Sequence, residues 1–191
     1  MNISRFKRFI KKKFVENIAS DYTYHTWDHV MNVLDVCNQY IKRYGISGND
    51  AYLLRTAALV HDIGFLWSQA SHEQKGVEYT LDILPDWGYS DSDIKIIDGL
   101  ILATQIPQKP STLLEQIICD ADLDYLGTDK FYKIGETLFQ EMKNLGHLST
   151  RKEWNDLQIR FLKSHTYHTP YARKFREPTK QKHLQDLISE Q

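Results

Sequence analysis

Histidine and aspartate are the side chains of this sequence whose types and spacing could do chemistry. Eight histidines stand beside only two cysteines, so a transition metal bound here would need imidazole and carboxylate ligands. In YHTWDHV, His25 and His29 are four residues apart, the spacing that places two side chains on one face of a helix. The pair His61-Asp62 ends the apolar run LLRTAALVHDIG. An ionisable pair there needs compensation, either by hydrogen bonds and a cap or by a divalent metal ion.

Two further clusters of polar residues are candidates for the same chemistry. CDADLDYLG holds Asp120, Asp122 and Asp124, and helical periodicity puts the first two at opposite borders of a buried stripe without choosing between them. Asp124 suits a solvent-facing edge. His72 and Glu73 begin another predicted helix, where an acid would also complement the helix dipole.

The elements that must position these residues are predicted to be helices. Apolar side chains recur every three or four residues from Val30 to Tyr44, before Gly45, and again up to His61. Stop and start signals place further helices at about 71–84, 91–106, 112–126, 131–145 and 154–165, with short ones from Pro170 and Pro178. The expected N-terminal caps are Asn49 or Asp50, Ser71 with Gln74, Asp91, Thr112 with Glu115, and Thr150 with Glu153.

Composition limits the remaining choices. With 191 residues, 41% hydrophobic and 26% charged, the chain is an ordinary globular one, and its net charge of −1 excludes an electrostatic nucleic-acid binder. No apolar run approaches the length of a membrane span. The first fifteen residues form a basic amphipathic segment, expected to dock by its apolar stripe, with contact to lipid, nucleic acid or a partner as the alternative. We expect one cytoplasmic, all-α domain over 1–191, and the sequence leaves its oligomeric state open.

The order of the histidine and aspartate residues carries a family resemblance. His29, then HDIG about thirty residues later, then an aspartate near residue 120, each on its own helix, resembles the H…HD…D motif of the HD superfamily of metal-dependent phosphohydrolases. YHTWDHV and DADLDYLG are similar to that family's first and last ligand helices. The resemblance covers about residues 20–130 and implies a helical bundle, on which helices from 131–191 would pack.

The resemblance also implies roles for individual residues. His29, His61, Asp62 and Asp122 would hold one divalent metal ion, such as Mn²⁺, Fe²⁺, Zn²⁺, Ni²⁺, Co²⁺ or Mg²⁺, and Asp62 would also orient the attacking water. His25 would donate a proton to the leaving oxygen, with a packing histidine as the alternative. Three residues could serve a second metal ion or the substrate, namely His72, Glu73 and Thr104. Thr104 and Gln105 stand where two-metal members carry a second histidine, which counts against a full second site.

The implied activity is hydrolysis of a phosphomonoester or phosphodiester, in a nucleotide or another small phosphorylated compound, by a metal-activated water. The substrate phosphate would need cations, and the candidates are Arg55, Lys75, Lys109, Arg173 and Arg176. Two alternatives remain, a di-iron oxygenase-like protein of the same fold and a non-catalytic nucleotide-binding regulatory module. The missing second histidine argues against the first alternative, and the apparent presence of all four ligands argues against the second.

Overall fold

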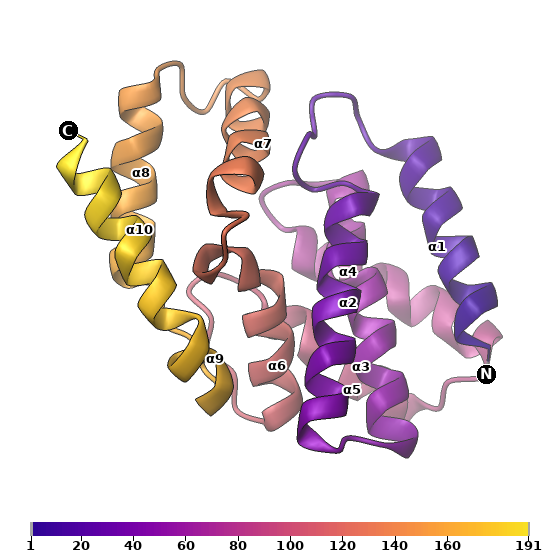
Figure 1. Ribbon diagram of the computed structural model, residues 1–191. Coiled ribbons are helices and arrows are strands. Elements are labelled where there is room, and N and C mark those ends of the chain that lie inside the picture. The colour runs from indigo at the N-terminus through magenta and orange to yellow at the C-terminus, as the bar shows by residue number, and fades with distance from the viewer. Residues whose placement is uncertain (1, 191) are drawn as a thin grey trace.

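The computed structural model describes residues 2–190, and over that range the chain is helical with no strand, as predicted (Figure 1). Residues 1 and 191, the ends of the expected domain, lie outside the described residues. The α-helices are α1 (Ile3–Asn17), α2 (Trp27–Tyr44), α3 (Gly48–Val60), α4 (His72–Ile83), α5 (Asp91–Ala103), α6 (Leu113–Asp122), α7 (Phe131–Asn144), α8 (Arg151–Ser164), α9 (Pro170–Phe175) and α10 (Glu177–Ser189). Three 3-10 helices follow α3, α4 and α6, namely η1 (Ile63–Leu66), η2 (Leu84–Trp87) and η3 (Asp124–Gly127). No helix of the described chain is both long and apolar enough to cross a membrane.

The main hydrophobic core lies among α1 to α6. The apolar stripes of α2, α3, α5 and α6 meet there, and α3 is buried on nearly all sides. The basic helix α1 contributes Phe6, Ile10 and Phe14, each fully buried, while its lysines face outward. The amphipathic segment therefore docks on the core by its apolar stripe, as expected.

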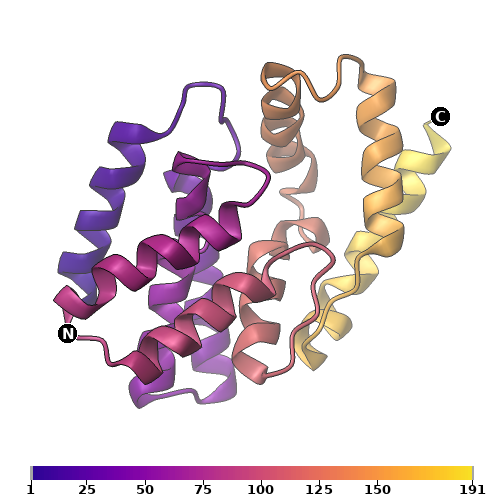
Figure 2. The ribbon, with the colours of Figure 1, turned by 180° about the vertical axis from the view of Figure 1, so that it is seen from behind.

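The helices after Gly127 pack mainly on one another and on η3. A second hydrophobic cluster holds Phe131, Ile159, Leu162 and Tyr167 from this part of the chain. α7, α8 and α10 stand side by side on the flank of the molecule opposite α1, as both views show (Figures 1 and 2). The polypeptide passes between the two clusters at α6 and η3, which carry the aspartate-rich string.

The capping predictions are confirmed in part. The two predicted capping boxes that contain glutamate form. The Thr112 and Thr150 hydroxyls each accept the backbone N–H of the glutamate three residues later, and that glutamate side chain accepts the backbone N–H of the threonine. The caps of α3 and α5 are wrong by one to three residues, since Ser47 and Ser90 occupy those positions. Ser71 does cap α4 by position, but its hydroxyl bonds the Ser68 hydroxyl at 3.0 Å instead of a helix N–H. The helix expected to continue to residue 126 ends at Asp122 and tightens into η3.

Candidate metal centre

Helix ends bring the four predicted ligands together. His29 lies in the first turn of α2, Asp122 is the last residue of α6, and His61-Asp62 joins α3 to η1. Glycine is required just after that pair, because a Cβ on Gly64 would lie 1.8 Å from the backbone oxygen of His72. This close approach is the physical reason for the glycine of HDIG. It sets the start of α4 directly beside Asp62.

The ligand atoms of His29, His61, Asp62 and Asp122 all lie within 4.8 Å of one another. His29 Nε2 is 3.0 Å from Asp122 Oδ1 and 3.2 Å from Asp62 Oδ2. His61 Nε2 is 3.2 Å from Asp62 Oδ2 and 3.5 Å from Asp122 Oδ1. The two Nε2 atoms are 3.3 Å apart. Two imidazole nitrogens and two carboxylate oxygens thus face a common point.

Charge in this cluster is balanced locally. Burial lowers the pKa of both imidazoles, but the carboxylates outweigh it, so the pKa of His29 is raised and that of His61 is raised well above its usual value. Burial raises the pKa of both carboxyls, but the imidazoles outweigh it, holding the pKa of Asp122 at about 2 and that of Asp62 well below its ordinary range. The two carboxylates, Asp62 buried and Asp122 half-buried, therefore attract positive charge strongly.

The donor set fits a divalent metal ion. His61 Nδ1 donates to the backbone oxygen of Ala58 at 3.0 Å, which leaves the Nε2 lone pair facing the cluster. Asp62 Oδ2 is buried and accepts no hydrogen bond, although it lies near both imidazoles. A buried carboxylate oxygen without a hydrogen bond is costly unless a cation sits beside it. Two imidazoles and two carboxylates suit Mn²⁺, Fe²⁺, Zn²⁺ and similar ions.

His25 lies in the segment before α2, not on the same helix face as His29. Its Nδ1 hydrogen bonds Oε1 of Glu141 in α7, and its ring is stacked on Phe65 at 3.9 Å between centroids. Oε2 of Glu141 accepts the backbone N–H groups of Thr23, Tyr24 and His25 at 3.0, 2.8 and 3.0 Å. Glu141 is therefore a buried clamp that holds the loop and the imidazole together.

Glu141 was not among the site residues predicted from the sequence. The residue is 1% exposed and stands 116 positions after His25, so no local pattern links the two. Burial raises the pKa of its carboxyl, but the hydrogen bonds from His25 and the backbone outweigh that and hold the pKa below its ordinary value. Its place beside the apolar stripe of α7, between Phe139 and Met142, is the one hint in the sequence.

The three candidates for binding a second metal ion or the substrate lie in different environments. His72 Nε2 lies 3.2 Å from Glu73 Oε1 and 4.0 Å from Asp62 Oδ1, and the His72 ring is stacked on the other face of Phe65 at 4.0 Å. Glu73 is buried instead of lying in solvent at the helix start. Thr104 is also buried, and its hydroxyl donates to the Ile101 carbonyl.

The other two aspartates of the acidic string serve the fold. Asp120 is fully buried and accepts the backbone N–H groups of His168 and Thr169, each at 2.8 Å. Asp124, expected at a solvent-facing edge, is buried and pairs with Arg176 at 2.7 Å because η3 turns it toward the C-terminal helices. Asp122 alone of the three joins the cluster.

The sequence-predicted cations are held elsewhere. The Arg55 guanidinium bonds Asn38 and the Ala51 backbone, Lys75 pairs with Glu78 at 2.6 Å, and Arg173 donates to the Tyr167 carbonyl. None of these three lines the hollow beside His29 and Asp122.

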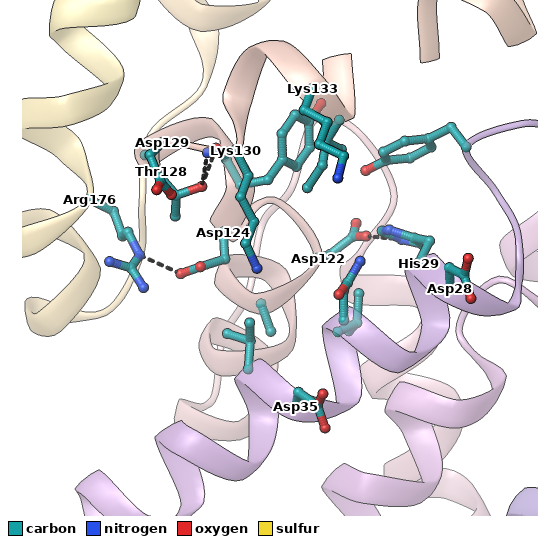
Figure 3. Close-up of a pocket in the computed structure, with 18 of the residues that line it drawn as sticks. Asp28, His29, Asp35, Asp122, Asp124, Thr128, Asp129, Lys130, Lys133 and Arg176 are labelled. Atoms are coloured by element: carbon teal, nitrogen blue, oxygen red, sulfur yellow. Dashed lines mark hydrogen bonds and ion pairs between the residues drawn. The ribbon is translucent and has the colours of Figure 1, made fainter. Parts of the chain in front are cut away.

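That hollow has a volume of about 1210 Å³ and separates α2 from the C-terminal helices (Figure 3). His29 and Asp122 line it, together with four basic residues, Lys130, Lys133, Lys182 and Arg176. Of the remaining candidate phosphate-binding residues, Arg176 lines the hollow, whereas Lys109 lines a small depression of about 350 Å³ near Pro107. The three lysines of the hollow were not singled out from the sequence.

A helical protein with two histidines and two aspartates converging at helix ends has the features of one known class. A profile of the HD domain matches residues 26–124, more than half of the chain. The chain therefore belongs to the HD-domain family, as the motif order indicated. No curated protein matches it significantly.

Two solved structures share the fold. The Bacillus subtilis protein YpgQ, solved in complex with ADP, is 17% identical, with a TM-score of 0.65 over 99% of this chain and 97% of that one. A structural genomics target from Lactobacillus plantarum is 15% identical, with a TM-score of 0.68 over 98% and 95% of the two chains.

Proposed function

We propose that this protein is a metal-dependent phosphohydrolase acting on a nucleotide or another small phosphate ester. The convergence of His29, His61, Asp62 and Asp122, with ligand atoms within 4.8 Å, carries the proposal. Membership of the HD-domain family supports hydrolysis, and the ADP bound to YpgQ supports a nucleotide as the substrate class. The hollow of about 1210 Å³ beside the cluster is large enough for such a compound.

The four residues of the cluster would hold one divalent metal ion. Bound there, the ion would lower the pKa of a water molecule and offset negative charge on the phosphoryl group. The Asp62 carboxylate, which is more buried than that of Asp122, would also orient the attacking water by accepting its hydrogen bond. His61 is held in one ring orientation by its bond to Ala58, so its Nε2 is presented to the centre.

His25 would act as the general acid. Glu141 engages Nδ1, so Nε2 is the ring nitrogen free to give a proton to the leaving oxygen. The His25 and His29 ring centroids are 6.1 Å apart, which places the acid next to the ligand cluster. The Glu141 carboxylate would fix the orientation of the imidazole for that transfer.

His72 and Glu73 would add to the site through Asp62. Their side chains and Asp62 Oδ1 form a second small group that could take a further cation or a substrate group. Thr104 would contact a substrate only by releasing its bond to Ile101.

The test is a metal analysis of the purified protein followed by phosphate-release assays across a panel of nucleotides and simple phosphate esters. We expect about one divalent ion per chain, and we expect His61→Ala and Asp62→Ala to lose metal and activity together. Glu136→Gln, on the exposed face of α7, is the matched control and should keep both. Full activity after complete metal removal would refute the proposal.

A further inference from the structure

Two of the basic residues that line the hollow lie at the N-terminal end of α7. Lys130 is the residue before α7 and Lys133 follows in its first turn, so the two lie three residues apart on one face. Both are exposed and line the hollow. Figure 3 shows both side chains extending from α7 into the space that His29 and Asp122 border.

Neither lysine is neutralised by the protein. Within residues 2–190, neither Lys130 nor Lys133 has an ion-pair partner. Arg176 differs, because its guanidinium is already engaged by Asp124 at 2.7 Å. The pair of lysines therefore presents two uncompensated charges toward a space that begins at the metal ligands.

The opposite wall has the reverse sign. Asp28 and Asp35 lie one turn either side of Asn32 along the exposed face of α2, and all three line the hollow. Carboxylates repel phosphoryl groups but accept hydrogen bonds from hydroxyl and amino groups. A ligand spanning the hollow would thus place its anionic groups along α7 and its hydroxyl-bearing or amino-bearing part along α2.

We propose that Lys130 and Lys133 bind a second phosphoryl group of the substrate, beyond the one placed at the metal centre. The inference rests on the proposed function for the placement of the first phosphoryl group. A hollow of about 1210 Å³ greatly exceeds what one phosphoryl group needs, and the lysine pair lines it together with His29 and Asp122. The pair would favour compounds with two phosphoryl groups over the corresponding monoesters.

The experiment measures binding by isothermal titration calorimetry at low and moderate salt. The probes are AMP, ADP and adenosine 3′,5′-bisphosphate, titrated into wild-type protein, Lys130→Ala, Lys133→Ala and the double variant. Lys163→Ala, an exposed lysine of α8 that does not line the hollow, is the charge-matched control. Thermal unfolding followed by circular dichroism checks that each variant folds.

We expect wild-type protein to bind at least one doubly phosphorylated probe more tightly than AMP. Each lysine should contribute about tenfold to that affinity, which corresponds to about 1.4 kcal/mol. AMP binding should change less than about twofold, and the salt dependence should weaken in the double variant. Whether ADP or the bisphosphate loses affinity tells whether the two groups are adjacent in the ligand.

Three results would overturn the proposal: equal affinity of wild-type protein for all three probes, an equal loss for AMP and the doubly phosphorylated probes, or the same loss in Lys163→Ala. Because binding is read without turnover, the two proposals fail separately. A protein that binds as expected but hydrolyses no phosphate ester would refute the phosphohydrolase and leave the lysine pair standing.

Discussion

Glu141 offers the sharpest test of how the site is built. Its carboxylate accepts three backbone N–H groups at 2.8–3.0 Å and also bonds His25, while the residue itself is 1% exposed. Hydrogen bonds to a charged group each contribute about 1.5–3 kcal/mol, and bonds that share one acceptor do not add fully. Water can reach the half-buried Thr23 and His25 donors, so we expect Glu141→Ala to cost about 3–4 kcal/mol of unfolding free energy.

Glu141→Gln separates positioning from folding. The amide oxygen can still accept the backbone N–H groups, so the stability loss should be about 1–2 kcal/mol. The amide NH₂ then faces Nδ1 of His25, which forces the other tautomer and removes the charged acceptor that holds the ring. We expect kcat to fall by about tenfold to a hundredfold, with KM and metal content unchanged.

Urea unfolding, metal analysis and the separate determination of kcat and KM are the measurements. Glu136→Gln, on the same helix, breaks only an exposed pair with Arg151 and should cost less than about 1 kcal/mol. A Glu141→Gln protein with wild-type kcat, or with a raised KM as its only defect, would refute the positioning role. A loss below about 1 kcal/mol in Glu141→Ala would refute the clamp itself.

Two further predictions concern the buried polar groups of the C-terminal half. Asp120→Asn replaces one acceptor oxygen by an amide NH₂ opposite the His168 or Thr169 N–H. The variant should lose about 2–3 kcal/mol of unfolding free energy in urea and keep wild-type metal content. Metal loss without destabilisation would contradict this prediction. Burial, then the neighbouring Lys180 charge, lowers the pKa of His165 to about 3, so the folded protein keeps this imidazole neutral while the unfolded chain protonates it below about pH 6.5. The unfolded state binds more protons as pH falls, so the free energy of unfolding should drop by about 2 kcal/mol between pH 8 and pH 5. The drop should be smaller in His165→Gln, and an equal drop in both proteins would contradict this role of His165.

Local patterns in the sequence predicted the helices well because helix formation and burial of an apolar stripe depend on neighbours three and four residues apart. The stripe of α1 and the boxes at Thr112 and Thr150 are local features of this kind. Several neighbouring polar residues could cap α3 and α5, and the structure has Ser47 and Ser90 at those positions, Ser90 through a capping box with Asp93. Ser71 shows the same competition, since Ser68 takes its hydroxyl.

The candidate site likewise has features that local sequence predicts and features that only the fold determines. The order His29, His61-Asp62 and an aspartate near 120 was enough to indicate the family, but the choice of Asp122 rested on resemblance. The fold separates the three aspartates by direction: α6 ends at Asp122 and points it at the imidazoles, while Asp120 and Asp124 face the C-terminal helices. Because residues two apart on a helix project to roughly opposite sides, only Asp122 joins the candidate metal cluster.

The sequence by itself determined an all-α chain and the order of its candidate metal ligands, because helices follow from spacings of a few residues and the order follows from residue identity. Only the tertiary structure decided that Glu141 holds His25 across 116 positions, and that Lys130 and Lys133 face the hollow beside His29. Contacts of that separation depend on how α7 is placed against α2 and α6. No local periodicity encodes that placement, since it results from the packing of two hydrophobic clusters on either side of η3.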